Sequence, residues 1–275
     1  MKLFNTTKGP AIEQEGYCYL IDEAWEDLVN DDNLYEKLHR LALKLPPADK
    51  AILQQLLPTI SPRQELWACG VTYLRSKIGR QEESKDAGGA DFYAKVYEAE
   101  RPEVFFKATH HRIVGHEGKV RIRQDSTWDV PEPELTLVVS SSGKIIGYTI
   151  GNDMSSRSIE GENPLYLPQA KTYDACAALG PCVYVVRDPL PADTQIQLTI
   201  TRGGNTVFTG AITIDQMKRS VEELVSFVYK ECSFPYGCLI MTGTGIVPGH
   251  NFTLLSGDVI SITIDAIGTL VNTVQ

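Results

Sequence analysis

The chain has 275 residues, of which 43% are hydrophobic and 22% are charged, an ordinary balance for a folded globular protein. Its 26 Lys and Arg residues against 35 Asp and Glu residues give a net charge of −9, which argues against a nucleic-acid or anionic-membrane partner because the field would repel phosphate. No apolar stretch reaches the roughly 18–20 residues that a membrane-spanning helix needs, and the opening residues show no apolar core typical of a signal peptide. We therefore expect a cytoplasmic protein.

The first part of the chain, residues 1–63, is expected to form a small α/β domain. A short run of aromatic and aliphatic residues at 17–21 predicts a strand. Apolar residues at helical spacing predict helices over 24–29 and 34–45 and, after two prolines, over 51–57.

The rest of the chain, residues 64–275, is dominated by short β-like runs separated by turn residues. One clear helix, 221–231, interrupts them, and strands and helices do not alternate regularly, which disfavours a doubly wound sheet. The fold class is therefore α+β, mainly β. The expected strands are 66–71, 104–107, 120–123, 135–140, 145–150, 182–187, 196–201, 207–211, 238–241, 259–264 and 268–274.

A polar, charge-rich stretch at about 75–101 separates the first two of these strands. A break at Gly88-Gly89 divides it into two expected helices, 75–86 and 91–100. Such an insertion is either a lid over a site or a solvated excursion of the chain, and the pattern alone favours neither.

Two acidic residues, Glu132 and Glu134, stand two positions apart at the start of an expected strand. Side chains alternate along a strand, so both carboxylates point to one face and repel each other. Solvent offsets this repulsion if the pair lies on the surface, and a cation offsets it if the pair forms a site.

Asp153 follows the next expected strand, which a tight turn brings back beside Glu132 and Glu134. As a residue at a strand end it suits a helix N-cap. It equally suits a third ligand, because three converging carboxylates are the hard oxygen donors that Mg²⁺ or Mn²⁺ prefers. The two roles are compatible.

Two further segments contain candidate substrate-binding groups. Lys171 closes a stretch with two prolines and two aromatic residues, and a lysine near a metal would bind a substrate carboxylate or stabilise an enolate. Thr242, Gly243 and Thr244 follow an apolar strand, where small residues let backbone amides approach an anionic ligand. A plain tight loop is the alternative for this second segment.

Taken in order, these landmarks resemble the fumarylacetoacetate hydrolase superfamily over residues 64–275. The resemblance rests on Glu132-x-Glu134, Asp153, Lys171, the sequence Leu-Gly-Pro at 179–181, Thr-Gly-Thr at 242–244 and the C-terminal run from Gly257 to Asn272. It implies a β-roll-like catalytic domain and a Mg²⁺ or Mn²⁺ site on Glu132, Glu134 and Asp153. It also implies a small anionic 2-oxo acid as substrate and a homodimer or higher homo-oligomer.

The chain departs from that family in the expected lid. Hydrolases of the family tend to carry a His and a Glu there that activate water for C–C cleavage, and Ser76 and Gly79 stand at those positions. The segments 97–109 and 162–171 instead resemble the 2-dehydro-3-deoxy-D-arabinonate dehydratase branch. That resemblance implies a Mg-dependent lyase that converts a 2-keto-3-deoxy pentonate to 2-oxoglutarate semialdehyde through a metal-stabilised enolate.

For this reaction Glu103, just before the strand at 104–107, is the first candidate for the general base, and Glu82 and Glu83 in the lid are the second. The alternative role is a buried or edge ion pair for Glu103 and a solvated helix face for Glu82 and Glu83. Arg75 and Arg80 could bind the substrate when the lid closes. Two alternatives stay open: a C–C hydrolase of acylpyruvates or diketo sugar acids with the same metal site, and a non-catalytic binding protein that keeps the fold.

Overall fold

The computed structural model describes the backbone of residues 1–83 and 95–275 and the side chains of residues 1–78 and 95–275. Within this part of the chain the larger of two sheets has ten strands. In spatial order they are β3 (Tyr17–Leu20), β2 (Gly9–Gln14), β1 (Lys2–Thr6), β10 (Ala177–Tyr184), β9 (Ile145–Ser156), β8 (Asp129–Val139), β13 (Cys238–Met241), β4 (Glu65–Gly70) and β5 (Glu103–Thr109), with β6 (Ile113–Val114) pairing beside β10.

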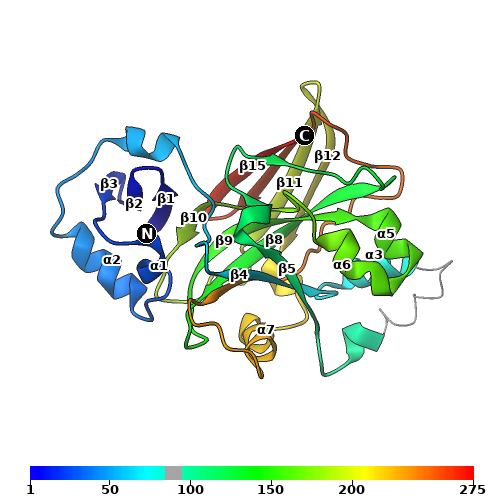
Figure 1. Cartoon of the computed structure of the whole chain (residues 1–275), viewed down its shortest axis with the longest axis horizontal. Coiled ribbons are helices and arrows are strands. Elements are labelled where there is room, and N and C mark those ends of the chain that lie inside the picture. The colour runs from blue at the N-terminus through cyan, green and yellow to red at the C-terminus, as the bar shows by residue number, and fades with distance from the viewer. Residues whose placement is uncertain (84–94) are drawn as a thin grey trace.

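The second sheet shares an apolar core with this long sheet, and the helices lie at the edges of the two sheets (Figure 1). The five strands of the second sheet are, in order, β12 (Asn205–Thr213), β11 (Gln195–Arg202), β14 (Val259–Ile264), β15 (Gly268–Val274) and β7 (Lys119–Val120). The α-helices are α1 (Trp25–Leu28), α2 (Leu34–Ala42), α3 (Leu74–Glu83), α5 (Arg157–Glu162), α6 (Leu167–Lys171) and α7 (Val221–Val228), and 3₁₀ turns cover Lys50–Gln54, His110–Arg112, Pro164–Tyr166 and Ile214–Gln216.

Strict alternation of side chains creates the main core between the two sheets. Leu135 and Leu137 of β8 are buried there with Leu198 of β11 and Ile262 of β14, and Leu224 of α7 closes the same cluster. Burial of apolar surface is the dominant stabilising contribution, on the order of 25 cal/mol per Å². The next residue along each strand points to the opposite face, which leaves one face of β8 for other uses.

The N-terminal strands extend the large sheet, because β1 pairs antiparallel with β10 through Leu3 and Val183. Helices α1 and α2 pack against it and bury Leu28 and Leu38 in a second apolar cluster. The expected boundary near residue 63 falls just before β4, but the sheet is continuous across it, so the division into domains at 1–63 and 64–275 stays a prediction. Among the described residues, we find no helix with the length and apolarity needed to cross a membrane.

Several expected elements differ from the structure. Strands β1 and β2 were not predicted, β8 begins at Asp129 instead of at residue 135, and β10 covers Ala177–Tyr184 where a strand over 182–187 was expected. The expected helix over 51–57 is the 3₁₀ turn Lys50–Gln54, and the expected strand over 120–123 has only the two residues of β7. The difference with the greatest effect on the site is in β9, which runs on to Ser156 instead of ending at Ile150. Gly, Asn and Asp after Ile150 suggested a turn, but β8 and β10 pair with β9 on both sides there and hold it extended. Asp153 is therefore inside a strand and is not a helix N-cap.

Candidate functional site

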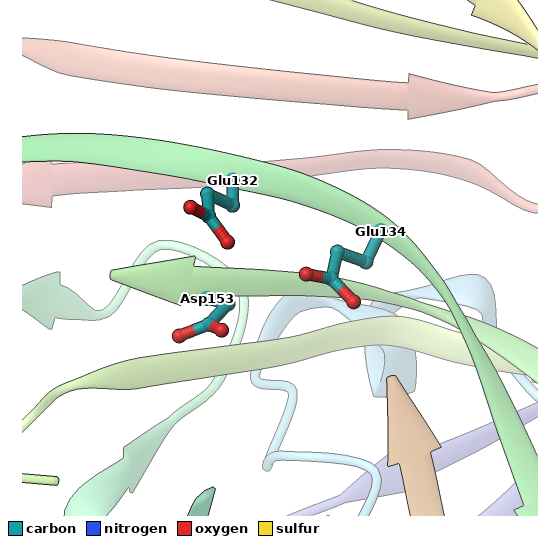
Figure 2. A group of neighbouring side chains, drawn as sticks. All are labelled: Glu132, Glu134 and Asp153. Carbon is teal, nitrogen blue, oxygen red and sulfur yellow. The ribbon is translucent and has the colours of Figure 1, made fainter. Parts of the chain in front are cut away.

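Three acidic side chains meet where β8 and β9 pair. The register places Glu132 directly opposite Asp153, and Glu134 opposite Gly151. Opposed residues share a face of the sheet, so the carboxylates of Glu132, Glu134 and Asp153 point toward one another (Figure 2). One oxygen from each lies within 4.8 Å of the others, and all three residues are buried. Strand pairing alone therefore assembles the cluster that the sequence predicted.

Lys171 reaches this cluster from the last residue of α6. Its Nζ donates hydrogen bonds to Oε2 of Glu132 at 2.8 Å and to Oδ2 of Asp153 at 3.0 Å. A third bond, 2.6 Å long, goes to Oγ of Ser155. The predicted lysine is thus a fully buried cation held between two of the three carboxylates.

A second buried lysine, Lys107 of β5, was not predicted. Its Nζ lies 2.5 Å from Oδ1 of Asp153, the carboxylate oxygen that Lys171 does not contact. It also donates hydrogen bonds to the carbonyl oxygens of Met154, at 2.9 Å, and of Lys171. Lys107 therefore holds Asp153, the end of β9 and the end of α6 in one arrangement.

An arginine and a fourth acid come from α5, which begins directly after β9. Nη2 of Arg157 donates to Oε1 of Glu132 at 2.6 Å. Glu160 lies one turn later, with Oε2 3.8 Å from Nε of Arg157 and Oε1 3.4 Å from Nζ of Lys171. Both side chains are buried. The site is therefore a buried network of charges rather than three acids alone.

The charges of this network explain why Glu134 is unusual. Burial raises the pKa of Glu134 well above its usual value, and the carboxylates of Asp153 and Glu132 raise the pKa further. Lys171 and the backbone amide of Gly243, which donates to Oε2 of Glu134 at 2.5 Å, act in the opposite direction. Desolvation and neighbouring negative charge both disfavour the ionised form.

A divalent cation fits this arrangement. The three carboxylate oxygens are hard donors of the kind that Mg²⁺ and Mn²⁺ bind, and a cation between them would remove the repulsion that raises the pKa of Glu134. The residues that would hold it are Glu132, Glu134 and Asp153.

The loop at 242–244 supports Glu134 instead of presenting free donors. The amide of Gly243 is bound to Glu134, and the hydroxyl of Thr242 donates to the carbonyl of Leu135 at 2.9 Å. Thr244 exchanges hydrogen bonds with the backbone of Ile246. Substrate binding by Thr242, Gly243 and Thr244 therefore stays a prediction, whereas the contacts of Thr242 and Gly243 with β8 are a feature of the fold.

Glu103 lies on the same face of the sheet as the cluster. A residue shares a face of the sheet with the residue paired opposite it on the next strand. Followed from β5 through β4 and β13 to β8, this pairing places Glu103 on the same face as Thr136, which is also the face of Glu134. Gly70, opposite Glu103, gives the carboxylate its space, since a Cβ there would lie 1.8 Å from Oε2 of Glu103. Glu103 stays the candidate base.

The predicted lid residues are only partly described. Arg75 is exposed on α3, and Ser76, at the position of the hydrolytic histidine, is buried. The side chains of Arg80, Glu82 and Glu83 lie outside the described residues. A short helical turn at 95–98 follows, and its end is tied to the body by Arg219, which donates to the carbonyls of Ala99 and Glu100.

Sequence reasoning missed Lys107, Ser155, Arg157 and Glu160. Period-two alternation along β5 from Glu103 would have placed Lys107 on the site face. The other three follow Asp153 closely, and the expectation that the strand ended before Asp153 removed them from consideration. A continuous β9 puts Ser155 on the same face as Asp153, and α5 then carries Arg157 and Glu160 toward it.

Comparisons with known proteins agree with this geometry. The family model described as "Fumarylacetoacetate (FAA) hydrolase C-terminal" matches residues 79–275. A probable 2-keto-3-deoxyxylonate dehydratase of Haloferax volcanii is 50% identical over 212 residues, covering 77% of this chain and 72% of the relative. The 2-dehydro-3-deoxy-D-arabinonate dehydratase of Saccharolobus solfataricus is 44% identical over 214 residues, with the same coverage of both chains.

A solved structure extends the likeness to the whole chain. It is a 2-keto-3-deoxy-D-arabinonate dehydratase complexed with magnesium and 2,5-dioxopentanoate, and it matches with a TM-score of 0.86 and 34% identity over 100% of this chain and 99% of its own. The mainly β fold with a β-roll-like catalytic domain is thereby confirmed. The matched family model covers most of the sequence, including every metal-site carboxylate. The chain therefore belongs to the fumarylacetoacetate hydrolase family.

Proposed function

We propose that the protein is a Mg²⁺-dependent dehydratase of a 2-keto-3-deoxy sugar acid, converting a five-carbon substrate such as 2-dehydro-3-deoxy-D-arabinonate to 2-oxoglutarate semialdehyde (2,5-dioxopentanoate). Two relatives at 50% and 44% identity carry dehydratase names, and a solved dehydratase of the same fold holds magnesium and 2,5-dioxopentanoate. One water leaves the substrate and all five carbons stay in one product.

The observation that carries the proposal is the position of Lys171 between the carboxylates. Its Nζ contacts Glu132 and Asp153, so a buried positive charge stands beside the place where three carboxylates converge. Ser76 and Gly79 occupy the positions where the resemblance implies a water-activating His and Glu. A site rich in fixed charge without that dyad suits removal of a proton and a hydroxyl better than attack by water.

Each residue has a definite task in this reaction. Glu132, Glu134 and Asp153 would hold the cation, which when bound supplies a Lewis acid for the substrate's carboxylate and keto oxygens. Lys171 stabilises negative charge that develops on the keto oxygen as the C3 proton leaves. Glu103, on the same face of the sheet, accepts that proton and returns it to the C4 hydroxyl, which departs as water. The unsaturated 5-hydroxy acid that remains tautomerises, with hydrogens moving from the C5 alcohol to C3 and C4, and gives the semialdehyde.

A product assay tests the proposal. Purified protein with Mg²⁺ is offered 2-keto-3-deoxy pentonates and an acylpyruvate in parallel, with Glu134→Ala and with EDTA-treated protein as controls. We expect a five-carbon semialdehyde from the pentonates, formed only with Mg²⁺ and only by the parent. Pyruvate release from acylpyruvate alone would establish the hydrolase alternative, and metal binding without any turnover would leave a binding protein.

The assembly state and location complete the proposal. We infer a homodimer or higher homo-oligomer, a Mg²⁺ or Mn²⁺ cofactor and a cytoplasmic location, as the resemblance and the sequence predict. Light scattering on the purified protein measures its mass in solution, and a mass of one chain, 30.4 kDa, would refute the oligomer.

A further inference from the structure

Four buried charged side chains form a closed ring beside the metal-site carboxylates. Glu132 contacts Arg157 through Oε1, at 2.6 Å, and Lys171 through Oε2, at 2.8 Å. Glu160 contacts the same two cations, Lys171 through Oε1 at 3.4 Å and Arg157 through Oε2 at 3.8 Å. Each cation therefore contacts both carboxylates of the ring, and the side chains of Glu160, Arg157 and Lys171 are all 1–2% exposed.

The two carboxylates of this ring differ in position. Glu132 lies on β8 inside the three-carboxylate cluster, whereas Glu160 lies on α5 and is not part of it. Glu132 thus has two competing tasks, because its oxygens bind Arg157 and Lys171 and are also the donors for a divalent cation. Glu160 contacts both cations, and its carboxylate is not one of the three that form the cluster.

We propose that Glu160 is a positioning residue that holds Arg157 and Lys171, so that Glu132 and Asp153 can turn their oxygens to the metal. The inference rests on the proposed function. When Glu132 binds the cation, its contacts to Arg157 and Lys171 weaken, and Glu160 is the carboxylate that keeps both side chains in place. Burial makes the loss of an opposite charge unfavourable, so a second carboxylate beside both cations stabilises them when Glu132 turns to the metal.

Charge balance supports the same role. Among the described residues four buried carboxylates, of Glu132, Glu134, Asp153 and Glu160, face the three cations of Lys107, Lys171 and Arg157. When all of these described groups are ionised, the carboxylates are in excess by one negative charge, and a divalent cation would compensate that excess together with the repulsion that raises the pKa of Glu134. If Glu160 were neutral, this excess would vanish, and Arg157 and Lys171 would compete more strongly with the metal for Glu132 and Asp153.

The test measures Mg²⁺ affinity directly, by calorimetry on the metal-free full-length protein, together with kcat and KM in the product assay. Glu160→Gln removes the charge at almost constant size, and Glu162→Gln, an exposed acid on the same helix, is the matched control. We expect Glu160→Gln to raise the Kd for Mg²⁺ by about tenfold to 100-fold, as loss of a residue that orients metal ligands commonly does. At saturating Mg²⁺ its kcat should fall more than its KM changes, because Lys171 is displaced.

A second variant separates charge from shape. Glu160→Asp keeps the negative charge but withdraws it slightly, so its Mg²⁺ Kd should stay closer to the parent value than that of Glu160→Gln. Equal weakening in both variants, or an unchanged Kd in Glu160→Gln, would overturn the inference. If the parent protein itself binds no Mg²⁺, the proposed function fails instead, and the two failures are thereby distinguished.

Discussion

The two faces of β8 show how one strand serves two opposite purposes. Leu135, Leu137 and Val139 point into the core between the sheets, where apolar contacts stabilise the fold. Glu132 and Glu134 point to the other face, where their burial is unfavourable until cations compensate it. All eleven residues of the strand are buried, so exposure alone does not distinguish the faces.

The difference between them lies in what each face needs from the rest of the chain. The core face needs apolar residues of suitable volume, which many parts of the chain supply and which tolerate substitution. The charged face needs specific partners at defined distances, supplied by Lys107 from β5, Arg157 from α5 and Lys171 from α6. Substitutions on the charged face should therefore abolish activity, whereas substitutions on the core face should lower the free energy of unfolding.

The largest effect is expected from Asp153→Asn on the charged face. The substitution removes a candidate metal ligand, the carboxylate that Lys107 contacts and one of the carboxylates around Lys171. We expect kcat/KM to fall by at least about 100-fold and the free energy of unfolding to fall by about 3–5 kcal/mol. Turnover assays and urea denaturation measure the two effects. Asp125→Asn, at an exposed ion pair, should match the parent in both, and retained turnover in Asp153→Asn would refute its role as a ligand.

A smaller effect, on stability alone, is expected from Leu137→Ala on the core face. Leu137 is fully buried, and truncation of such a side chain costs about 2–5 kcal/mol in free energy of unfolding. The kcat of the folded protein should not change, since Leu137 points away from the carboxylates.

The neighbouring substitution Thr136→Val provides the comparison on the other face. It keeps the side-chain volume and removes a hydroxyl that has no hydrogen-bond partner among the described residues, so the free energy of unfolding should stay near the parental value. A loss of kcat in Leu137→Ala would show that the two faces are coupled.

The smallest effect concerns Asp129, the one acid at the end of β8 that points toward the core face. Burial raises the pKa of Asp129 from 3.8 to about 6. Between these values the unfolded chain has lost a proton that the folded chain keeps, so this group makes the protein less stable as the pH rises from about 4 to about 6. Above that range its unfavourable contribution is constant.

Asp129→Asn should therefore be more stable than the parent at pH 7.5 and closer to the parent at pH 5. Thermal unfolding at the two pH values measures this difference. Asp193→Asn, an exposed acid, serves as the control and should show no such change between the two pH values. A difference of the same size at both pH values would mean that Asp129 is ionised in the folded protein throughout.

The sequence by itself determined the local chemistry of this protein. Alternation along the segment after Asp129 put Glu132 and Glu134 on one face, and the short connection to the next strand brought Asp153 beside them. The predicted strands and the metal-site acids were recoverable because they depend on periodicity and on contacts between neighbours in the chain. The family resemblance then supplied the order of the distant landmarks, including Lys171.

Only the tertiary structure decided which cations meet these acids. Lys107, Arg157 and Lys171 come from three elements, and their distances to Glu132 and Asp153 depend on pairing of β9 with both β8 and β10. Residues after Ile150 favour a turn by local preference, and hydrogen bonding on both sides of the strand overrides that preference. The ring through Glu160 follows from the same cause, since the length of β9 sets where α5 begins and therefore where its charges point.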